Sequence, residues 1–219
     1  MIKRIYSFLF LTTIVSPLFA QKDGSNDPDA KKILDAVSAK FRTYKAVQAS
    51  FTYKVENSNG KTISTKKGTV YMKGTKYRVS FIGQEIFCDG NNVWTYDKSA
   101  NEVTITKLDP TSNTLTPQKL FTNFYDKDFL YKLNGERKEA GKIVQEIEMT
   151  PNDKNKPFHK VYLLVDKNSK AIYSTRVLEK EGNRYSYTVN SLNGSANVPD
   201  AKFVFNKKNY PGVEEVDLR

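Results

Sequence analysis

Residues 51–56 have the sequence Phe-Thr-Tyr-Lys-Val-Glu, in which every second side chain is apolar. In an extended strand, alternate side chains point to opposite faces, so Phe51, Tyr53 and Val55 share one face. The polar side chains between them share the other face, and an Asn-Ser-Asn-Gly turn follows at residues 57–60. This stretch predicts a half-buried strand that ends in a tight turn.

The same two-residue period recurs almost to the end of the chain, and turn residues separate the segments that show it. Asp89-Gly90-Asn91-Asn92, Asn134-Gly135 and Asn193-Gly194 are typical of turns between antiparallel strands. We therefore expect an antiparallel meander of about eleven or twelve strands. The predicted strands lie within residues 51–55, 70–73, 77–81, 85–88, 93–96, 103–106, 129–133, 143–149, 160–165, 171–178, 185–191 and 202–205.

Two segments have the period of an amphipathic helix instead. The first follows Asp27-Pro28, which is typical of a capping residue and a proline in the first turn. The second follows Thr116-Pro117, which can cap and start a helix in the same way. The apolar stripe of the first helix includes Ile33, Val37 and Phe41, and that of the second consists of Leu120, Phe121 and Phe124.

The number of strands bears on what the sheet encloses. A barrel of about eight strands is filled by its own side chains, whereas a larger one leaves a lumen. An apolar hollow covered by two helices would bind an apolar ligand. Alternatively, the helices plug the sheet and form its ordinary core. The periodicity leaves both interpretations open.

Side chains suited to catalysis and metal binding are scarce. The chain of 219 residues contains one cysteine, Cys88, and one histidine, His159. It therefore cannot form an internal disulfide or a thiolate zinc site, and we expect no metal and no cofactor. Glu146 and Glu148 share a face of one predicted strand, where paired carboxylates can perform acid-base catalysis, but a charged outer face is the favoured interpretation. The composition argues against an enzyme.

Residues 1–20 have the organisation of a secretory signal peptide. Lys3 and Arg4 precede an apolar run at residues 5–15, and a segment that ends in Ala20 follows. A membrane anchor is the alternative, but the apolar run is short for a spanning helix. No cysteine follows the predicted cleavage site, so we expect an exported, soluble, periplasmic protein. A polar tail would cover residues 21–28, and a single domain residues 29–219.

The chain is basic, with 35 lysines and arginines against 24 acidic residues and a net charge of +11. Its lysines are scattered and form no arginine-rich block, so nucleic acid is not an expected partner. A basic surface keeps a protein soluble, and it also attracts anionic membranes or acidic partners. The sequence alone leaves these two roles open.

Five segments stand in an order and spacing that are typical of one protein family. They are Ala-Ser-Phe-Thr-Tyr-Lys-Val at residues 49–55, Gly-Thr-Val-Tyr-Met-Lys at 68–73, Cys-Asp-Gly-Asn-Asn-Val-Trp-Thr-Tyr-Asp at 88–97, Asp-Ala-Lys-Phe-Val-Phe at 200–205 and Pro-Gly-Val-Glu at 211–214. Together they resemble the LolA family of periplasmic lipoprotein carriers. The resemblance covers residues 29–219.

The resemblance implies a mainly β protein of the LolA/LolB type, an unclosed antiparallel β-barrel of about eleven strands with a lid of short helices. Its apolar cavity would hold the acyl chains of acylated lipoproteins. A lipoprotein-releasing ABC transporter in the inner membrane would supply them, and an outer-membrane acceptor would receive them. Such a carrier is not an enzyme, needs no cofactor, binds no nucleic acid and is expected to be a monomer.

The candidate cavity wall and lid follow from combining this resemblance with the strand and helix patterns. Strand parity groups Phe51 with Tyr53, and Tyr77 with Val79 and Phe81, without showing which face lines the cavity. The expected wall consists of Phe51, Tyr53, Tyr77, Val79, Phe81 and Trp94. The expected lid consists of Ile33, Val37, Phe41, Leu120, Phe121 and Phe124.

One position departs from the family pattern. Many members have Arg-Pro after the lysine that corresponds to Lys73, and that arginine helps to latch the lid, whereas Gly74-Thr75 stand here. A latch at this position is therefore in question, and Lys73 and Arg78 are the candidates to substitute for the arginine. The alternative functions are an exported lipid-sensing domain and a glycan- or peptide-binding β module, neither of which would transfer cargo.

Overall fold

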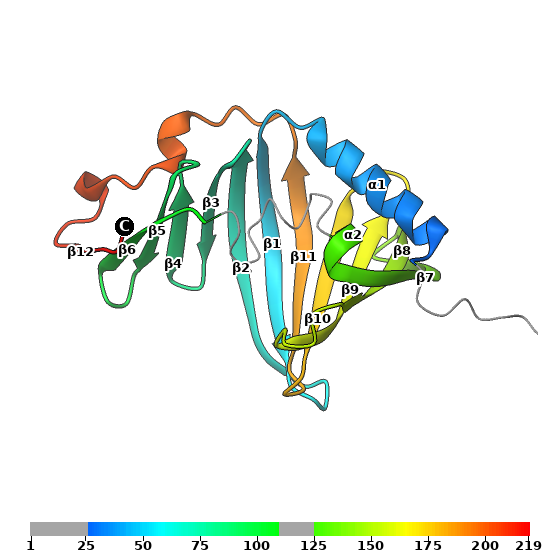
Figure 1. The fold of residues 1–219 in the computed structure, drawn as a ribbon. Helices are drawn as coiled ribbons and strands as arrows, with labels where there is room; N and C mark the ends of the chain where they lie inside the picture. The colour runs from blue at the N-terminus through cyan, green and yellow to red at the C-terminus, as the bar shows by residue number, and fades with distance from the viewer. Residues whose placement is uncertain (1–25, 110–124) are drawn as a thin grey trace, which may run out of the picture.

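The chain forms a strongly curved β-sheet of twelve strands (Figure 1). The computed structural model describes residues 26–109 and 125–219. The strands are β1 (Val47–Glu56), β2 (Thr62–Lys73), β3 (Lys76–Phe81), β4 (Gln84–Cys88), β5 (Asn92–Asp97), β6 (Glu102–Lys107), β7 (Phe129–Glu139), β8 (Lys142–Pro151), β9 (Phe158–Asp166), β10 (Ile172–Glu179), β11 (Arg184–Asn193) and β12 (Glu214–Asp217). The helices are α1 (Pro28–Arg42), α2 (Tyr125–Asp128) and the 3-10 helices η2 (Asp200–Phe203) and η3 (Lys207–Asn209).

The sheet consists of two runs of antiparallel hairpins that meet in its middle. Strands β1 to β6 form one run and β7 to β11 the other, and β1 pairs with β11 to join them. The short strand β12 pairs in parallel with β6. Because the order begins at β12 and ends at β7, the sheet is not closed. The predicted class, a mainly β protein with an unclosed antiparallel sheet, is confirmed.

The predicted strand at residues 202–205 is wrong. Asp200 begins η2 there, and its carboxylate accepts hydrogen bonds from Lys73 Nζ at 2.7 Å and Lys76 Nζ at 2.6 Å. Phe203 is fully buried beside Val198. The alternating apolar side chains therefore anchor a helical turn to the sheet and do not form a strand.

Two further details of the strand prediction are wrong. Asn134-Gly135 lies inside β7, where the pairing with β8 shifts its register, so the glycine accommodates a bulge and not a turn. Gly135 has a φ of +122°, a conformation that favours glycine. Strand β12 was not expected, because its sequence, Glu-Glu-Val-Asp, contains one apolar residue and shows no alternation.

The helix predicted after Asp27-Pro28 is confirmed as α1. Asp27 is its N-cap, and one carboxylate oxygen accepts hydrogen bonds from the backbone N–H groups of Asp29 at 2.8 Å and Ala30 at 3.4 Å. The residues predicted for the second helix, Leu120, Phe121 and Phe124, lie outside the described residues, as does the predicted signal segment 1–20.

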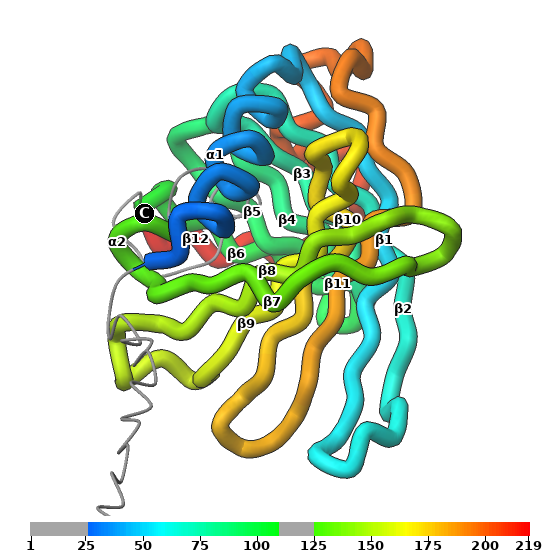
Figure 2. The backbone as a smooth tube through the Cα atoms, turned by 90° about the vertical axis from the view of Figure 1, so that its right-hand side faces the viewer, coloured from blue at the N-terminus to red at the C-terminus, as the bar shows by residue number. Residues whose placement is uncertain are grey.

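The two faces of the sheet are covered by different parts of the chain. The sheet curls around α1, whose apolar side packs on the concave face of β7 to β10 (Figure 2). The opposite, convex face of β2 to β6 is covered by residues 196–213 of the C-terminal segment. The central strands β1, β2, β3 and β11 therefore extend beyond both covers.

Candidate functional site

Five of the six predicted wall residues share the concave face of the sheet. Phe51 pairs with Gly68 of β2, and Gly68 pairs with Phe81 of β3, so these positions form one row across the sheet. Side chains two residues apart along a strand keep the same face. The row places Phe51, Tyr53, Tyr77, Val79 and Phe81 together on the face that α1 also contacts.

An aromatic patch lies on this face where the central strands extend beyond α1; its residues are Phe51, Tyr53, Phe81, Tyr185 and Tyr187. The ring centroids of Tyr53 and Phe81 are 4.9 Å apart, and those of Tyr53 and Tyr187 are 5.0 Å apart. The ring centroids of Phe51 and Phe81 are 5.6 Å apart. Tyr187 is 38% exposed, although it is a large aromatic residue. The patch therefore offers unused apolar area to a ligand.

The sequence interpretation missed Tyr185 and Tyr187. Both lie in a predicted strand, but that strand is more than a hundred residues away from β1 along the chain. The pairing of Tyr53 with Tyr187 brings them into the patch. Only the long-range pairing of β1 with β11, which no local pattern encodes, reveals them.

Tyr77 and Val79 continue the apolar face toward α1. Tyr77 is buried with Val47, Met72 and Cys88, and Val79 packs against the same cluster. Phe41 of α1 also packs against it. The concave face is thus apolar from the helix-covered core to the open aromatic patch.

Trp94 lies on the other face of the sheet, so it does not join the other five wall residues. It pairs with Phe87 in the register of β4 with β5, whereas Val93 pairs with Cys88 on the concave face. Trp94 packs against the cluster of Tyr96, Val103 and Val213 under the C-terminal segment. The prediction that Trp94 belongs to the cavity wall is therefore wrong. The register in which β5 pairs with β4 places its side chain on the convex face.

The predicted lid residues of α1 face the sheet. Val37 is buried in the core, together with Ala30 and Leu34, and Ile33 and Phe41 pack at its margin. These contacts are those of an ordinary helix-on-sheet core.

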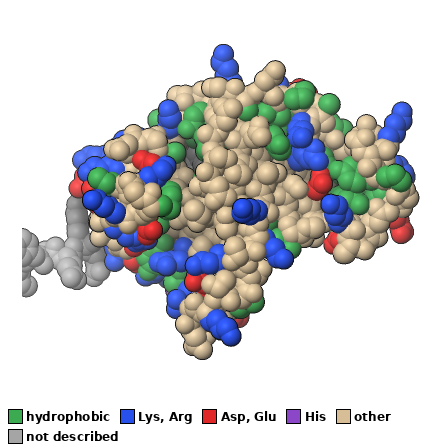
Figure 3. Space-filling view, turned by 180° about the vertical axis from the view of Figure 1, so that it is seen from behind, with side chains coloured by type: hydrophobic (Ala, Val, Ile, Leu, Met, Phe, Trp, Pro, Cys, Tyr) green, Lys and Arg blue, Asp and Glu red, His purple; other side chains and the backbone are tan. Residues whose placement is uncertain are grey.

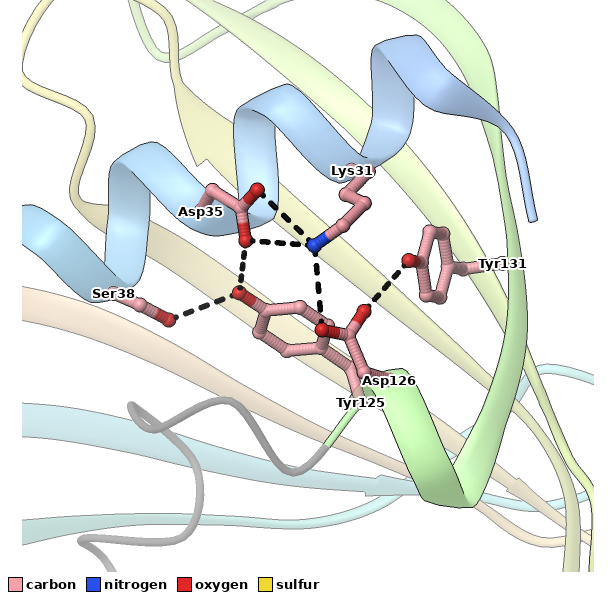
Figure 4. Close-up of polar contacts among 6 residues, drawn as sticks. All are labelled: Lys31, Asp35, Ser38, Tyr125, Asp126 and Tyr131. Carbon is pink, nitrogen blue, oxygen red and sulfur yellow. Dashed lines mark hydrogen bonds and ion pairs between the residues drawn. The ribbon is translucent and has the colours of Figure 1, made fainter.

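A polar network attaches α1 to α2 and β7 (Figure 4). Tyr125 Oη donates a hydrogen bond to Asp35 Oδ1 at 3.1 Å and lies 3.2 Å from Ser38 Oγ. Lys31 Nζ bridges Asp35 at 3.2 Å and Asp126 at 3.3 Å. Asp126 in turn accepts a hydrogen bond from Tyr131 Oη at 2.8 Å.

A second attachment holds the start of α1 to the edge strand β7. The backbone N–H of Leu133 donates to Asp27 Oδ2 at 2.8 Å, and that of Tyr131 donates to Asn26 Oδ1 at 3.0 Å. The Leu133 N–H bond is the main cause that lowers the pKa of Asp27. The capping carboxylate thus also satisfies a backbone donor of a sheet edge.

Neither of the two residues suggested to replace the latching arginine reaches α1. Lys73 is paired with Asp200 at the start of η2. Arg78 is paired with Glu85 at 2.5 Å, and its guanidinium lies 4.4 Å from the centre of the Phe87 ring. Both side chains leave the sheet on its convex face, so the suggestion is wrong.

Three tyrosines of the concave face, Tyr53, Tyr77 and Tyr187, have raised pKa values. Burial raises the pKa of Tyr77 to about 12, and burial also raises the pKa of Tyr53. Loss of solvent also raises the pKa of Tyr187, as does the neighbouring Tyr185. The phenols therefore remain neutral and suit an apolar ligand with a polar edge.

The residues with catalytic potential do not converge on this face. Burial opposes the ionisation of Glu146 and Glu148, but hydrogen bonds from Asn134, Arg137 and Lys160 outweigh it and lower the pKa of both carboxyls. They are salt-bridged on the convex side. Burial raises the pKa of the Cys88 thiol. Within residues 26–109 and 125–219, no group of three or more potential ligands could hold a metal ion.

The convex face of the central strands is polar instead. Figure 3 shows its middle dominated by uncharged polar side chains and backbone, with scattered lysines around it. A shallow hollow of about 430 Å³ lies there, lined by Ser50, Lys67, Gly68, Thr69, Ser80 and Asn190. An apolar ligand would therefore prefer the concave face.

Comparison with known proteins agrees with this geometry. The family model for the outer membrane lipoprotein carrier protein LolA matches residues 42–206. An outer-membrane lipoprotein carrier protein of Cupriavidus necator is 30% identical over 125 residues, which cover 53% of this chain and 57% of that relative. The chain thus spans little more than half the length of this relative.

Solved structures share the fold at low identity. An uncharacterised conserved protein from Thermus thermophilus superposes with a TM-score of 0.60 at 15% identity, covering 86% of this chain and 99% of that one. MucB superposes with a TM-score of 0.51 at 18% identity, covering 84% of this chain and 65% of that one. No helix among the described residues is long and apolar enough to cross a membrane.

Proposed function

The chain belongs to the LolA family of outer membrane lipoprotein carrier proteins, and from this premise we propose that it carries lipoproteins by their acyl chains. The aromatic patch and the apolar face that continues from it toward α1 would hold these chains. The observation that carries the proposal is the partly exposed cluster of Phe51, Phe81 and Tyr187 on the concave face.

The energetics of acyl chains match such a surface. Each methylene group transferred out of water contributes about 0.8 kcal/mol, so one long chain left in water costs on the order of 10 kcal/mol. An unclosed sheet can cover a chain of variable length, because its edges need not close around the ligand. Neutral tyrosines and phenylalanines on the patch accept the chain without leaving a charge buried.

Helix α1 and the segment before α2 are proposed to form the lid. The network of Lys31, Asp35 and Tyr125 would take the part that the latching arginine plays elsewhere in the family. A lid that contacts the sheet when no cargo is bound must be displaced when cargo binds. This displacement lowers the net affinity of the protein for cargo and permits release.

The cellular role is proposed on the same basis. Residues 1–20 would direct export, and the exported protein would be periplasmic and monomeric. Its partners would be acylated lipoproteins, a lipoprotein-releasing ABC transporter of the inner membrane and an acceptor at the outer membrane. The protein would act as a carrier and not as an enzyme, without a cofactor and without binding nucleic acid.

The test is direct identification of what the protein binds. Organic extracts of gently purified protein, analysed by mass spectrometry, should contain acyl lipid or acylated peptide. The variants Val79→Glu and Phe81→Glu should lose binding of a fluorescent fatty acid, because each buries an unpaired charge on the concave face. Bound sugar or unmodified peptide in the extract, together with unchanged fatty-acid binding by the folded variants, would overturn the proposal.

A further inference from the structure

One row of side chains crosses the concave face from the core under α1 to the open end of the sheet. The strand register places six residues opposite one another, in order from β8 to β2: Ile147, Leu163, Thr175, Tyr187, Tyr53 and Lys66. Residues that lie opposite one another share a face of the sheet. The row therefore runs from aliphatic side chains, through the aromatic patch, to a cation.

Lys66 lies directly beside the aromatic patch. It pairs with Tyr53 across β1 and β2, and the Cβ atoms of such opposite residues are about 5 Å apart. Its side chain is exposed and forms no ion pair with a described residue. Strand β3 does not flank it, because the pairing of β2 with β3 ends at Gly68 and Phe81. An exposed cation thus stands at the open end of an apolar surface.

Two hydroxyl groups beside Lys66 are also available to a ligand. They belong to Tyr53 and Tyr187, whose ring centroids are 5.0 Å apart. Neither hydroxyl has a hydrogen-bond partner in the part of the chain that the structure describes. A phenol can donate one hydrogen bond and a lysine ammonium three. This end of the row therefore offers donors and a positive charge, which suit a head group with negatively charged oxygens.

One acidic residue, Glu179, acts on the other side of the patch. Burial raises the pKa of Tyr185, and so does its hydrogen bond with Glu179. Glu179 lies on β10, and the sheet order places β11 and β1 between β10 and β2. Three strand spacings, about 14 Å along the sheet, therefore separate the backbones of Glu179 and Lys66. The carboxylate is not placed to neutralise the lysine.

We propose that this row binds an acyl amphiphile with an anionic oxygen head group, a carboxylate or a phosphate. Its chain would lie on the aromatic patch and extend toward Leu163 and Ile147. Tyr53 and Tyr187 would donate hydrogen bonds to oxygens near the head, and Lys66 would pair with its charge. The inference rests on the proposed function, in which the patch holds acyl chains, and adds anionic lipids to the acylated lipoproteins as ligands.

The exposure of Lys66 makes such a pair favourable. A fully buried ion pair loses much of its attraction to desolvation, whereas a head group at the open end keeps part of its water. Hydrogen bonds in which a partner is charged are stronger than neutral ones. The pair would therefore select charged head groups and fix the direction in which the chain lies, with its tail toward α1.

The experiment measures how well dodecanol, dodecanoate and dodecyl phosphate displace an uncharged fluorescent acyl ester from the exported protein, free of cargo, at neutral pH. These ligands share one chain and differ in the head group. Both anions should bind about tenfold more tightly than dodecanol. Lys66→Gln should lower the affinity for both anions about tenfold, to that for dodecanol, whereas Lys66→Arg should retain the preference because it keeps the charge.

The two anions distinguish the source of the head group, since free fatty acids and phosphate-bearing lipids share this chemistry. A larger loss for dodecyl phosphate than for dodecanoate in Lys66→Gln would assign the site to phosphate-bearing lipids. An equal or smaller loss would assign it to free fatty acids. Tyr187→Phe should lower the affinity for both anions about threefold, because it removes one donor.

Lys67→Gln is the matched control. Lys67 is the next residue on the same strand, but it pairs with Thr52 and points to the convex face. The control removes the same charge from the protein and should keep the preference for the anions. Thermal unfolding of each variant checks the fold, which exposed lysines should not affect.

Three results would overturn the proposal: dodecanol binding as tightly as the anions, an unaltered preference in Lys66→Gln, or equal losses in the Lys66 and Lys67 variants. In each case, binding of the uncharged acyl ester would still support the carrier function. A protein that binds neither the ester nor any of the dodecyl ligands would contradict the carrier function together with this inference.

Discussion

The ring of Phe51 lies directly over Gly68 on the neighbouring strand. A Cβ atom added to Gly68 would lie 2.3 Å from Phe51 Cζ, well inside any real contact. Gly68 itself is buried, and it pairs with both Phe51 and Phe81 in the sheet. The missing side chain therefore lets the end of the ring extend over β2 and approach Phe81, at 5.6 Å between ring centroids, which makes the aromatic patch continuous.

Gly68→Ala should displace the Phe51 ring and break this continuity. We expect it to destabilise the fold by about 1–3 kcal/mol, as overpacking does, and to weaken fatty-acid binding. Phe51→Leu in the same chain should restore part of the stability, because the smaller side chain removes the clash. Thermal unfolding of the single and double variants measures this coupling. Strictly additive losses would show that the ring and the glycine do not interact.

The amino end of α1 depends on Asp27. Asp27→Ala removes the helix cap and the acceptor for the Leu133 N–H, so it should cost about 1–2 kcal/mol of unfolding free energy. Asp27→Asn keeps an acceptor oxygen for the cap and should cost less. Chemical denaturation measures both, and an equal loss for Asn and Ala would contradict the capping role.

Asp27 also predicts a dependence on pH. Its pKa is lowered in the folded protein, chiefly by the hydrogen bond from Leu133 N–H. A carboxyl with a lowered pKa stabilises the fold above its unfolded pKa of about 4, and this stabilisation is lost as the pH falls through the folded pKa. The difference in stability between the unchanged protein and Asp27→Asn should therefore shrink below about pH 4. A difference that is constant from neutral pH to about pH 3 would exclude the carboxylate as its source.

The network around Tyr125 tests whether α1 is a lid. Tyr125→Phe removes the hydrogen bonds to Asp35 and Ser38, and Ser38 is 1% exposed, so about 1 kcal/mol should be lost. If α1 must move for uptake, this variant should take up a fluorescent fatty acid faster than the unchanged protein. Lys32→Ala is the control, because its exposed pair with Asp29 lies within α1. Equal uptake rates for all three proteins would make α1 static structure.

Trp94 provides a test of the face assignment. Because it lies on the convex face under the C-terminal segment, Trp94→Phe should leave fatty-acid affinity unchanged within twofold. The fluorescence of the single tryptophan should likewise not respond when a fatty acid binds. A large change in either measurement would place the ligand on the convex side.

Sequence patterns predicted secondary structure correctly where neighbouring residues alone determine it. Asp27-Pro28 starts α1 as expected, because capping and proline geometry are local. The alternation in residues 51–56 correctly predicts a strand, and its parity groups Phe51 with Tyr53. These features need no information from elsewhere in the chain.

The features that sequence could not supply depend on distant contacts. Trp94 alternates correctly within its strand, but its face depends on how the preceding turn sets the pairing of β5 with β4. Tyr187 joins the patch only through the pairing of β1 with β11. Residues 202–205 alternate like a strand, yet ion pairs from Lys73 and Lys76 to Asp200 and the burial of Phe203 fix a helical turn.

The most direct test of the central claim, that acyl chains lie on the concave face, uses two neighbours on β11. Tyr187 belongs to the aromatic patch, whereas Thr188 pairs with Thr52 and points to the convex face. A photo-crosslinking phenylalanine analogue placed at either position would be irradiated in the presence of a fatty acid, and the products identified by mass spectrometry. The account predicts an adduct from position 187 and none from position 188. Adducts from position 188, or equal yields from both, would contradict it.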